Sequence, residues 1–98
     1  MKDVMIDIET LGNGPMAVMI QFGAVYFDRH TGETGKQVFF NVDADSCVEL
    51  GFEMDSSTVF WWLQQSPEAR QSITTQKTNR LDIHNAMHVI NDFLKEAE

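Results

Sequence analysis

Two carboxylates interrupt an apolar run near the start of the sequence. In VMIDIETLG, residues 4–12, Asp7 and Glu9 are separated by Ile8 alone. If this segment is a β-strand, residues i and i+2 point to the same side, and the Cα atoms of the two acids lie about 6.6 Å apart. Two carboxylates on one strand face can hold one hard divalent cation, or bridge two cations about 4 Å apart. The spacing predicts half of a metal site, although the same tripeptide also suits a strand end that meets solvent.

The residues that follow the acids end the apolar run. Thr10 and Gly12 allow the chain to turn sharply after the strand. We expect such a turn to expose backbone amides, which are groups that bind phosphate oxygens. The strand end is therefore a candidate position for the phosphate or sugar of a substrate.

Two adjacent tryptophans form the next candidate. Trp61 and Trp62 lie in a segment with helical features, and exposed indole rings can stack on nucleobases. Neighbouring residues on a helix point about 100° apart, so one of the two at most would face a site. The simpler interpretation, which we favour, is that one indole anchors the core and the other covers a sheet edge.

The histidines and the remaining acids carry weaker signals. His84 and His88 have the i, i+4 spacing of a zinc pair, but H-N-A-M-H lacks the glutamate of a metalloprotease helix. A solvated pair explains them better, and a turn explains His30. A solvated loop and a helix cap likewise explain three further acids: Asp43, Asp45 and Asp55.

Strands must position the acids, and three are expected, near residues 2–8, 17–27 and 36–42. The two glycines of DRHTGETG, residues 28–35, indicate a turn that joins the second and third strands as an antiparallel hairpin. We expect residues 43–54 to be mostly loop. The second strand is apolar on both faces, which is typical of a central strand. One face would carry Val18, Ile20, Phe22, Ala24 and Tyr26, and the other Met19, Gly23, Val25 and Phe27.

Three helices are expected after the strands, near residues 56–64, 67–74 and 80–97. Asp55 or Ser56 can cap the first helix, and the Ser-Pro dipeptide at 66–67 is a typical start for the second. Thr78 or Asn79 could cap the third, in which apolar residues recur along one stripe: Ile83, Met87, Ile90 and Leu94. This order predicts an α/β fold with helices packed on the sheet.

Composition limits the classes of function. The chain has 98 residues, a net charge of −8 and one cysteine, Cys47. The acidic balance argues against a broad basic surface for nucleic acid, but it allows a site where metal ions meet phosphates. We expect no membrane-spanning helix and a reducing, intracellular setting. The oligomeric state stays open, and an exposed sheet edge could drive self-association.

Two stretches of the chain resemble a known family. MIDIETLG, followed by the apolar strand AVMIQFGAVYFD, a glycine-containing turn and a third strand, is similar to the first motif of the DEDD (DnaQ-like) 3'-5' exonucleases, which have a ribonuclease H-like fold. STVFWWLQQSPEARQSI resembles a narrower branch that includes the exonuclease part of exodeoxyribonuclease VIII and phage exonucleases. The likeness runs along nearly the whole chain.

The resemblance implies two Mg²⁺ or Mn²⁺ ions, held by four acids, acting at the 3' end of DNA or RNA. Asp7 and Glu9 match two of these acids, with Asp7 shared between both ions and Glu9 on one. Thr10, Leu11 and Gly12 match positions that contact the terminal nucleotide. The other two acids and the general base of the family have no counterpart in this sequence. We therefore expect residues 1–98 to be the N-terminal part of one exonuclease domain, inactive alone; the alternative is a non-catalytic remnant that binds nucleic acid or protein.

Overall fold

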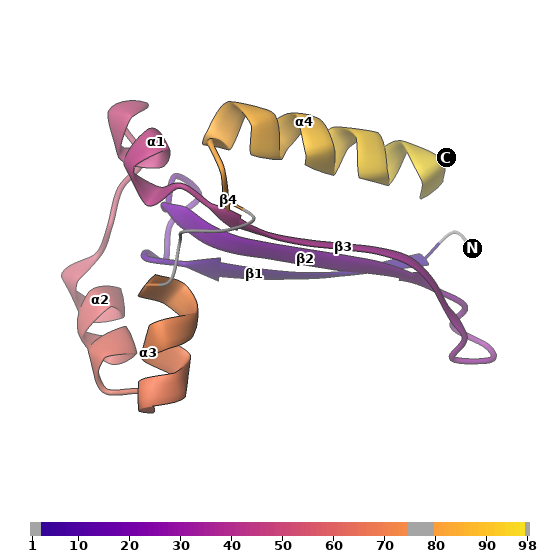
Figure 1. The fold of residues 1–98 in the computed structure, drawn as a ribbon, viewed down its shortest axis with the longest axis horizontal. Coiled ribbons are helices and arrows are strands. Elements are labelled where there is room, and N and C mark those ends of the chain that lie inside the picture. Colours follow the sequence, from indigo (N-terminus) through magenta and orange to yellow (C-terminus); the bar gives the residue numbers. More distant parts are fainter. Residues whose placement is uncertain (1–2, 75–79, 98) are drawn as a thin grey trace.

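Three long strands and one short one form a single mixed sheet in the computed structural model, which describes residues 3–74 and 80–97. In order across the sheet they are β1 (Asp3–Thr10), β2 (Met19–Phe27), β3 (Thr34–Val42) and β4 (Arg80–Leu81). β1, β2 and β3 are antiparallel, and β4 pairs with β3 in parallel (Figure 1). The expected antiparallel sheet with the second strand in the interior is confirmed, but the sheet has four strands instead of three.

The turn between β2 and β3 forms as its residues predict. Asp28 accepts a hydrogen bond at its backbone oxygen from the Gly32 N–H (2.8 Å), and at its carboxylate from the His30 N–H (2.8 Å). Gly32 has a φ of 76°, a conformation that a residue with a Cβ rarely adopts. The hairpin brings β3 back along β2 and fixes their register.

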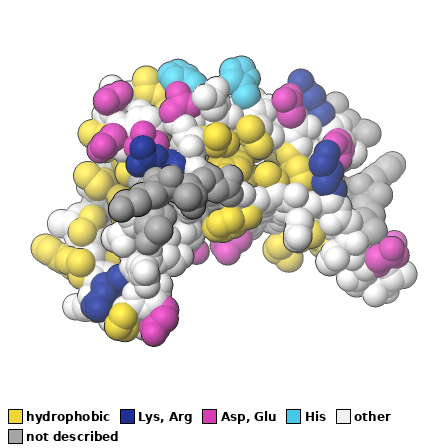
Figure 2. All heavy atoms as spheres, viewed as in Figure 1, with side chains coloured by type: hydrophobic (Ala, Val, Ile, Leu, Met, Phe, Trp, Pro, Cys, Tyr) yellow, Lys and Arg dark blue, Asp and Glu magenta, His cyan; other side chains and the backbone are white. Residues whose placement is uncertain are grey.

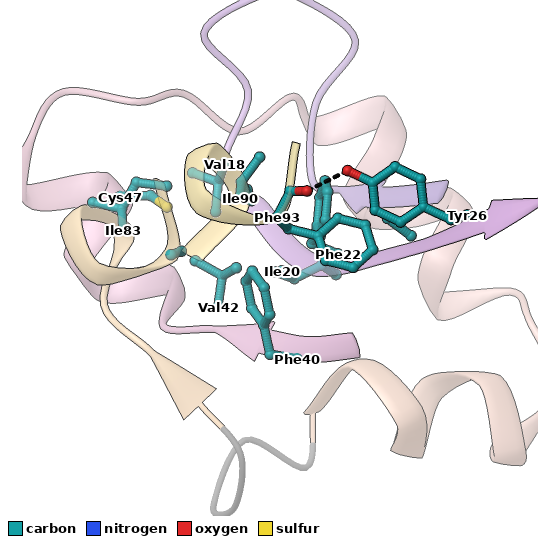
Figure 3. Packing of buried hydrophobic residues seen from close by; sticks show 12 residues of the cluster. Val18, Ile20, Phe22, Tyr26, Phe40, Val42, Cys47, Ile83, Ile90 and Phe93 are labelled. Carbon is teal, nitrogen blue, oxygen red and sulfur yellow. Dashed lines mark hydrogen bonds between the residues drawn. The ribbon is translucent and has the colours of Figure 1, made fainter. Parts of the chain in front are cut away.

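A helix on one side of the sheet closes the hydrophobic core. α4 (Ile83–Leu94) runs along β2 and β3 (Figure 1), and its Asp82 N-cap accepts a hydrogen bond from the Asn85 N–H (3.0 Å). The Tyr26 hydroxyl donates to the backbone oxygen of Phe93 (Figure 3). The predicted inner face of the second strand is confirmed, since all five of its residues are buried. The main buried side chains are Val18, Ile20, Phe22, Tyr26, Phe40, Val42, Cys47, Ile83, Ile90 and Phe93 (Figure 3).

The remaining helices are shorter: α1 (Ala44–Glu49), α2 (Ser56–Leu63), α3 (Pro67–Thr74) and the 3-10 turn η1 (Lys95–Ala97). α2 and α3 lie on the side of the sheet opposite α4 (Figure 1). The Ser66 hydroxyl accepts a hydrogen bond from the Ala69 N–H (3.2 Å), as expected for a cap before Pro67.

Several expectations for the second half of the chain are wrong. Part of 43–54 is helical in α1, because the Asp43 carboxylate caps it by accepting from the Asp45 N–H (3.1 Å). The third helix does not begin at residue 80, since Arg80 and Leu81 pair with β3. Its cap is Asp82, whereas Thr78 and Asn79 lie outside the described residues.

The stripe predicted for the last helix is also only partly correct. Ile83 and Ile90 are buried, but Met87 is 43% exposed and Leu94 only half-buried. Ala86 and Phe93 complete the buried stripe instead. The true period is i, i+3, i+7, i+10, which also lies on one face of a helix.

The charged side chains on the surface are dispersed. In the view of Figure 2, lysine and arginine side chains lie singly, with aspartate and glutamate nearby. Two ion pairs join distant segments, Arg29 with Asp3 and Lys36 with Glu96 (2.6 Å). Within the ranges that the structure describes, no helix is long and apolar enough to cross a membrane.

Candidate active site

Strand register places the two acids on the same face of the sheet. Asp7 lies opposite Gly23 on β2, and Glu9 lies opposite Gln21. Directly opposed residues of antiparallel strands share a face. Along β2, Gly23 and Gln21 alternate with the residues that form the core under α4, so they point to the other face. Asp7 and Glu9 therefore lie on the face away from α4, which we call the acidic face.

The surroundings of Glu9 disfavour its negative charge. Glu9 is half-buried and Asp7 is exposed. Burial raises the pKa of Glu9 above its ordinary value, and repulsion from the Asp7 carboxylate raises it further. Ionised Glu9 is thus destabilised in the folded chain, first by burial and then by the neighbouring carboxylate. A divalent cation between the two groups would relieve this repulsion.

α3 lies against the acidic face beside Glu9. Gln21 is buried, and its side-chain amide donates to the backbone oxygen (2.8 Å) and the hydroxyl (3.1 Å) of Ser72. Because Gln21 is the residue directly opposite Glu9, these bonds hold α3 close to the acidic pair.

The ladder between β1 and β2 changes register immediately after Glu9. Glu9 pairs with Gln21, but Thr10 pairs with Met19, so β2 carries an extra residue at this point. A bulge of this kind bends the strand and redirects the side chains that follow. Residues 10–13, which we call the strand-end loop, follow the bulge and contact α2 and its N-cap residue.

Four hydrogen bonds of 3.0 Å or shorter join residues 10–13 to one another, to Trp62 or to Asp55. The Thr10 hydroxyl donates to the Gly12 oxygen (2.7 Å), and the Trp62 indole N–H donates to the Thr10 oxygen (3.0 Å). Asp55 makes the other two, donating its N–H to the Leu11 oxygen (2.9 Å) and accepting from the Asn13 N–H at its carboxylate (2.7 Å). The loop is therefore held by α2 and its N-cap residue.

Gly12 is needed because neighbouring atoms approach it closely. A Cβ at this position would lie 3.1 Å from the Ala17 Cβ, 3.2 Å from an Asp55 carboxylate oxygen and 3.2 Å from the Glu53 backbone oxygen. Such distances leave no room for a methyl group unless the neighbours move. Gly12 thus allows the loop to pack against the segment before α2.

A pocket of about 470 Å³ opens between the strand-end loop and α2. Its wall combines one carboxylate with hydroxyl, amide and indole groups. The lining residues are Ile8, Glu9, Thr10, Gly12, Asn13, Ser57, Thr58, Trp61 and Trp62. A cavity of this size suits a ligand as large as a nucleotide.

One expectation about the strand end requires correction. The turn does not expose the Leu11 amide, because that N–H continues the β-ladder and donates to the Val18 oxygen (2.9 Å). The Leu11 side chain is half-buried against the core and does not line the pocket. Thr10 and Gly12 line the pocket, and the substrate-binding role of all three residues stays a prediction.

The tryptophans also differ from the interpretation that we favoured. α2 has no buried residue, so neither indole anchors the core. Trp62 is half-buried and holds the strand-end loop, whereas Trp61 is 53% exposed and lines the pocket. The two rings meet edge to face, with centroids 4.9 Å apart and an interplanar angle of 80°.

Sequence reasoning did not assign Asn13, Ser57 or Thr58 to the site, and it explained Asp55 as a helix cap alone. No motif marks the first three, and they meet only when α2 folds against the loop. Among the residues with described positions, no group of three or more His, Cys, Asp or Glu side chains could hold a metal ion. His84 and His88 are exposed on α4 and belong to no such group.

An α/β sheet with paired acids at the end of its first strand is compatible with the ribonuclease H-like fold of many nucleases. The chain belongs to the family described as the 3'-5' exoribonuclease Rv2179c-like domain, whose model matches residues 2–98. The exonuclease resemblance seen in the sequence is thereby confirmed. A family of exonucleases implies nucleic acid as the class of substrate, and such enzymes generally use divalent metals.

A viral protein gives a second comparison. The chain is 32% identical to the exodeoxyribonuclease of Enterobacteria phage T4 over 82 aligned positions, which cover 74% of this chain and 35% of the phage protein. The chain thus spans about a third of the length of that relative. No solved structure matches the chain.

Proposed function

We propose that this chain is the N-terminal part of a 3'-5' exonuclease domain that hydrolyses phosphodiester bonds with two divalent metal ions. The observation that carries the proposal is the acidic pair, which lies on one strand face beside a nucleotide-sized pocket in a member of an exonuclease family. The raised pKa of Glu9 supports it, because burial and the neighbouring Asp7 carboxylate both disfavour a negative charge that a bound cation would neutralise.

In this proposal Asp7 and Glu9 are the metal ligands that this chain contributes. Asp7 would hold both ions and Glu9 one of them, through carboxylate oxygens of the kind that Mg²⁺ and Mn²⁺ prefer. When bound, the ions activate a water and stabilise the leaving oxygen. Thr10 and Gly12 lie at the pocket wall next to Glu9, and they would position the terminal nucleotide.

The proposal covers both DNA and RNA as substrates. The family description names an exoribonuclease, whereas the phage relative is an exodeoxyribonuclease. Discrimination between the two depends on contacts to the 2'-hydroxyl. The hydroxyls of Thr10, Ser57 and Thr58 are the groups in the pocket that could make such contacts.

We further propose that the 98-residue chain is inactive alone. Hard cations of this type require about six oxygen ligands, and the described part of the chain brings two carboxylates to the site. The same observation favours a second candidate function, in which the chain binds nucleic acid or a protein without cleaving it.

Binding of Mn²⁺, followed by electron paramagnetic resonance, tests the metal assignment. We expect weak binding that Asp7→Asn and Glu9→Gln each reduce, and that Asp45→Asn leaves unchanged, since Asp45 is an exposed acid on α1. Equal Mn²⁺ affinity in Asp7→Asn and the unmodified chain would contradict the assignment.

A digestion assay tests the proposed inactivity. The purified chain, with Mn²⁺ and 5'-labelled single-stranded DNA or RNA, should give no ladder of products shortened from the 3' end. A ladder that disappears in Asp7→Asn would show that two acids suffice, and would overturn the inactivity while supporting the exonuclease assignment.

A further inference from the structure

α2 exposes apolar side chains on the side where a surface helix usually carries polar ones. Ser56, Phe60 and Leu63 recur at i, i+4 and i+7 and so lie along one line of the helix, which we call the α2 stripe. Phe60 is 61% exposed and Leu63 is 59% exposed. Figure 2 shows hydrophobic side chains at the outer edge of the molecule in the region of α2. In the single chain, two large apolar side chains of this stripe therefore face water.

α4 shows how a helix with one solvent-facing side is built in this chain. It buries four residues against the sheet and exposes polar ones, including His84, Asn85, His88 and Asn91. α2 differs, because it has no buried residue and no residue from 56 to 67 is charged. An uncharged helix that is apolar on more than one side is typical of a helix that packs against a further partner.

Charge decides which partner suits the α2 stripe. The chain carries a net charge of −8, so two copies repel each other unless they meet through a surface without acids. The exposed apolar side chains of β1 fail this condition, since Ile6 and Ile8 flank Asp7. The α2 stripe meets it, because the acids closest to it in the sequence, Asp55 and Glu68, lie outside the helix. A second copy of this chain can therefore approach the stripe without bringing carboxylates face to face.

We infer that the α2 stripe is the contact surface of a homodimer, in which a second copy of this chain packs its own α2 stripe against the first. Two-fold symmetry places the same residues on both sides, so Phe60 and Leu63 of each copy become buried. Neither side chain lines the pocket at the end of β1, and pairing leaves that pocket open. Each copy contributes one short helix, far less than the roughly 20 to 30 residues of a standard interface, so we expect a dissociation constant roughly in the micromolar range.

Sedimentation velocity of the purified chain, at a series of concentrations that spans the micromolar range, tests the inference. The unmodified chain should shift from monomer to dimer as the concentration rises and form no larger species, because a two-fold contact is closed. Added NaCl should strengthen the dimer, since it screens the repulsion between two acidic chains. A chain that stays monomeric throughout would leave the stripe to a different partner and overturn the inference. A dimer that salt dissociates would indicate ion pairs and would also overturn it.

Phe60→Lys is the most informative variant, because it removes apolar surface from the stripe while it lowers the net negative charge from −8 to −7. It should weaken the dimer by about tenfold or more, as for loss of a residue at the centre of an interface. Phe60→Leu keeps an apolar side chain and should lose less. If the copies met through any other surface, the reduced repulsion in Phe60→Lys would leave the dimer unchanged or strengthen it.

Met87→Lys is the matched control, because it makes the same change of charge at a residue that is 43% exposed on α4, on the other side of the sheet. It should not weaken the dimer. Circular dichroism melting of each variant separates loss of association from loss of folding. Equal dimer affinity in folded Phe60→Lys and Met87→Lys chains would overturn the inference. These measurements include neither metal nor nucleic acid, so their failure would leave the metal assignment intact.

Discussion

On the α4 face of the sheet, Ile20 and Phe22 are each 2% exposed, whereas on the acidic face Met5 and Phe39 are 59% and 58% exposed. α4 contributes four buried residues to the core, but α2 and α3 contribute none. Most of the hydrophobic stabilisation therefore comes from the α4 face. The acidic face holds the paired carboxylates and, at the end of β1, the pocket. The difference indicates that one face of the sheet maintains the fold while the other is available for chemistry.

Adjacent phenylalanines on β3 give the strongest test of this comparison. Phe40→Ala should destabilise the fold by about 3 to 5 kcal/mol, because Phe40 is 2% exposed and stacks on Phe22 with centroids 5.5 Å apart. Phe39→Ala, on the acidic face, should cost about 1 kcal/mol or less. Urea denaturation measures both. Similar losses for the two variants would show that the faces contribute equally to stability.

Two glycines near the strand end test how tightly the loop packs. Gly12→Ala should destabilise the fold by about 1 to 3 kcal/mol, since the methyl group would press on Ala17 and on the Glu53 backbone. Gly14→Ala is the control, because a Cβ there meets nothing within 4 Å, and it should change stability by about 0.5 kcal/mol at most. A neutral Gly12→Ala would mean that the loop adapts freely.

Two helix-capping aspartates differ in what their carboxylates bind. Asp82 caps α4 itself, whereas the Asp55 carboxylate makes no cap bond to α2 and binds the Asn13 N–H instead. Alanine at either position should cost about 1 kcal/mol. Only Asp55→Ala should also weaken binding of a single-stranded oligonucleotide, measured by fluorescence anisotropy, because it releases one wall of the pocket. Equal oligonucleotide affinity in both variants would show that the strand-end loop does not contribute to binding.

The smallest expected change in folding stability concerns the acidic pair. Here the removal of one negative charge should raise the free energy of unfolding. Because the folded chain raises the pKa of Glu9 above its ordinary value of 4.5, ionisation of Glu9 lowers stability as pH rises through that range. Glu9→Gln should therefore be more stable than the unmodified chain at pH 7, by less than about 1 kcal/mol. The difference should vanish below about pH 4.5.

Asp7→Asn should act in the same direction at pH 7, since it removes the charge that repels Glu9. Added Mn²⁺ should stabilise the unmodified chain slightly and the Asp7→Asn chain less. Thermal unfolding with and without Mn²⁺ measures both. If Asp7→Asn costs more than about 1 kcal/mol, the acids are structural.

The sequence predicted those parts of the molecule that depend on local periodicity. Alternation in β2 identified its buried face, and the i, i+2 spacing placed Asp7 and Glu9 together. It did not predict β4, because two residues become a strand only by pairing with Asn41 and Val42 nearly forty positions earlier. Similarly, α1 is six residues long and has little periodicity to detect.

The pocket was less predictable than the acidic pair, because its walls come from segments far apart in the sequence. Its walls are joined by hydrogen bonds across 42 residues, from Asn13 to Asp55, and across 52 residues, from Trp62 to Thr10. No spacing rule covers contacts of this range. The helical spacing of Trp61 and Trp62 predicted that one indole at most would face a site, but the favoured interpretation of a core anchor and a sheet-edge cover was wrong, and only the tertiary contacts show the role of each ring.

Asp55 joins two segments that would otherwise fluctuate separately. Its N–H and carboxylate bind the strand-end loop, while its backbone oxygen accepts from the Val59 N–H (3.0 Å) and so begins α2. When α2 frays from its first turn, the Asn13 N–H loses its acceptor at the same moment. The amide protons of Asn13 and Val59 should therefore exchange with solvent at similar rates, as members of one cooperative unit. A ligand that seats in the pocket would then slow the exchange of both.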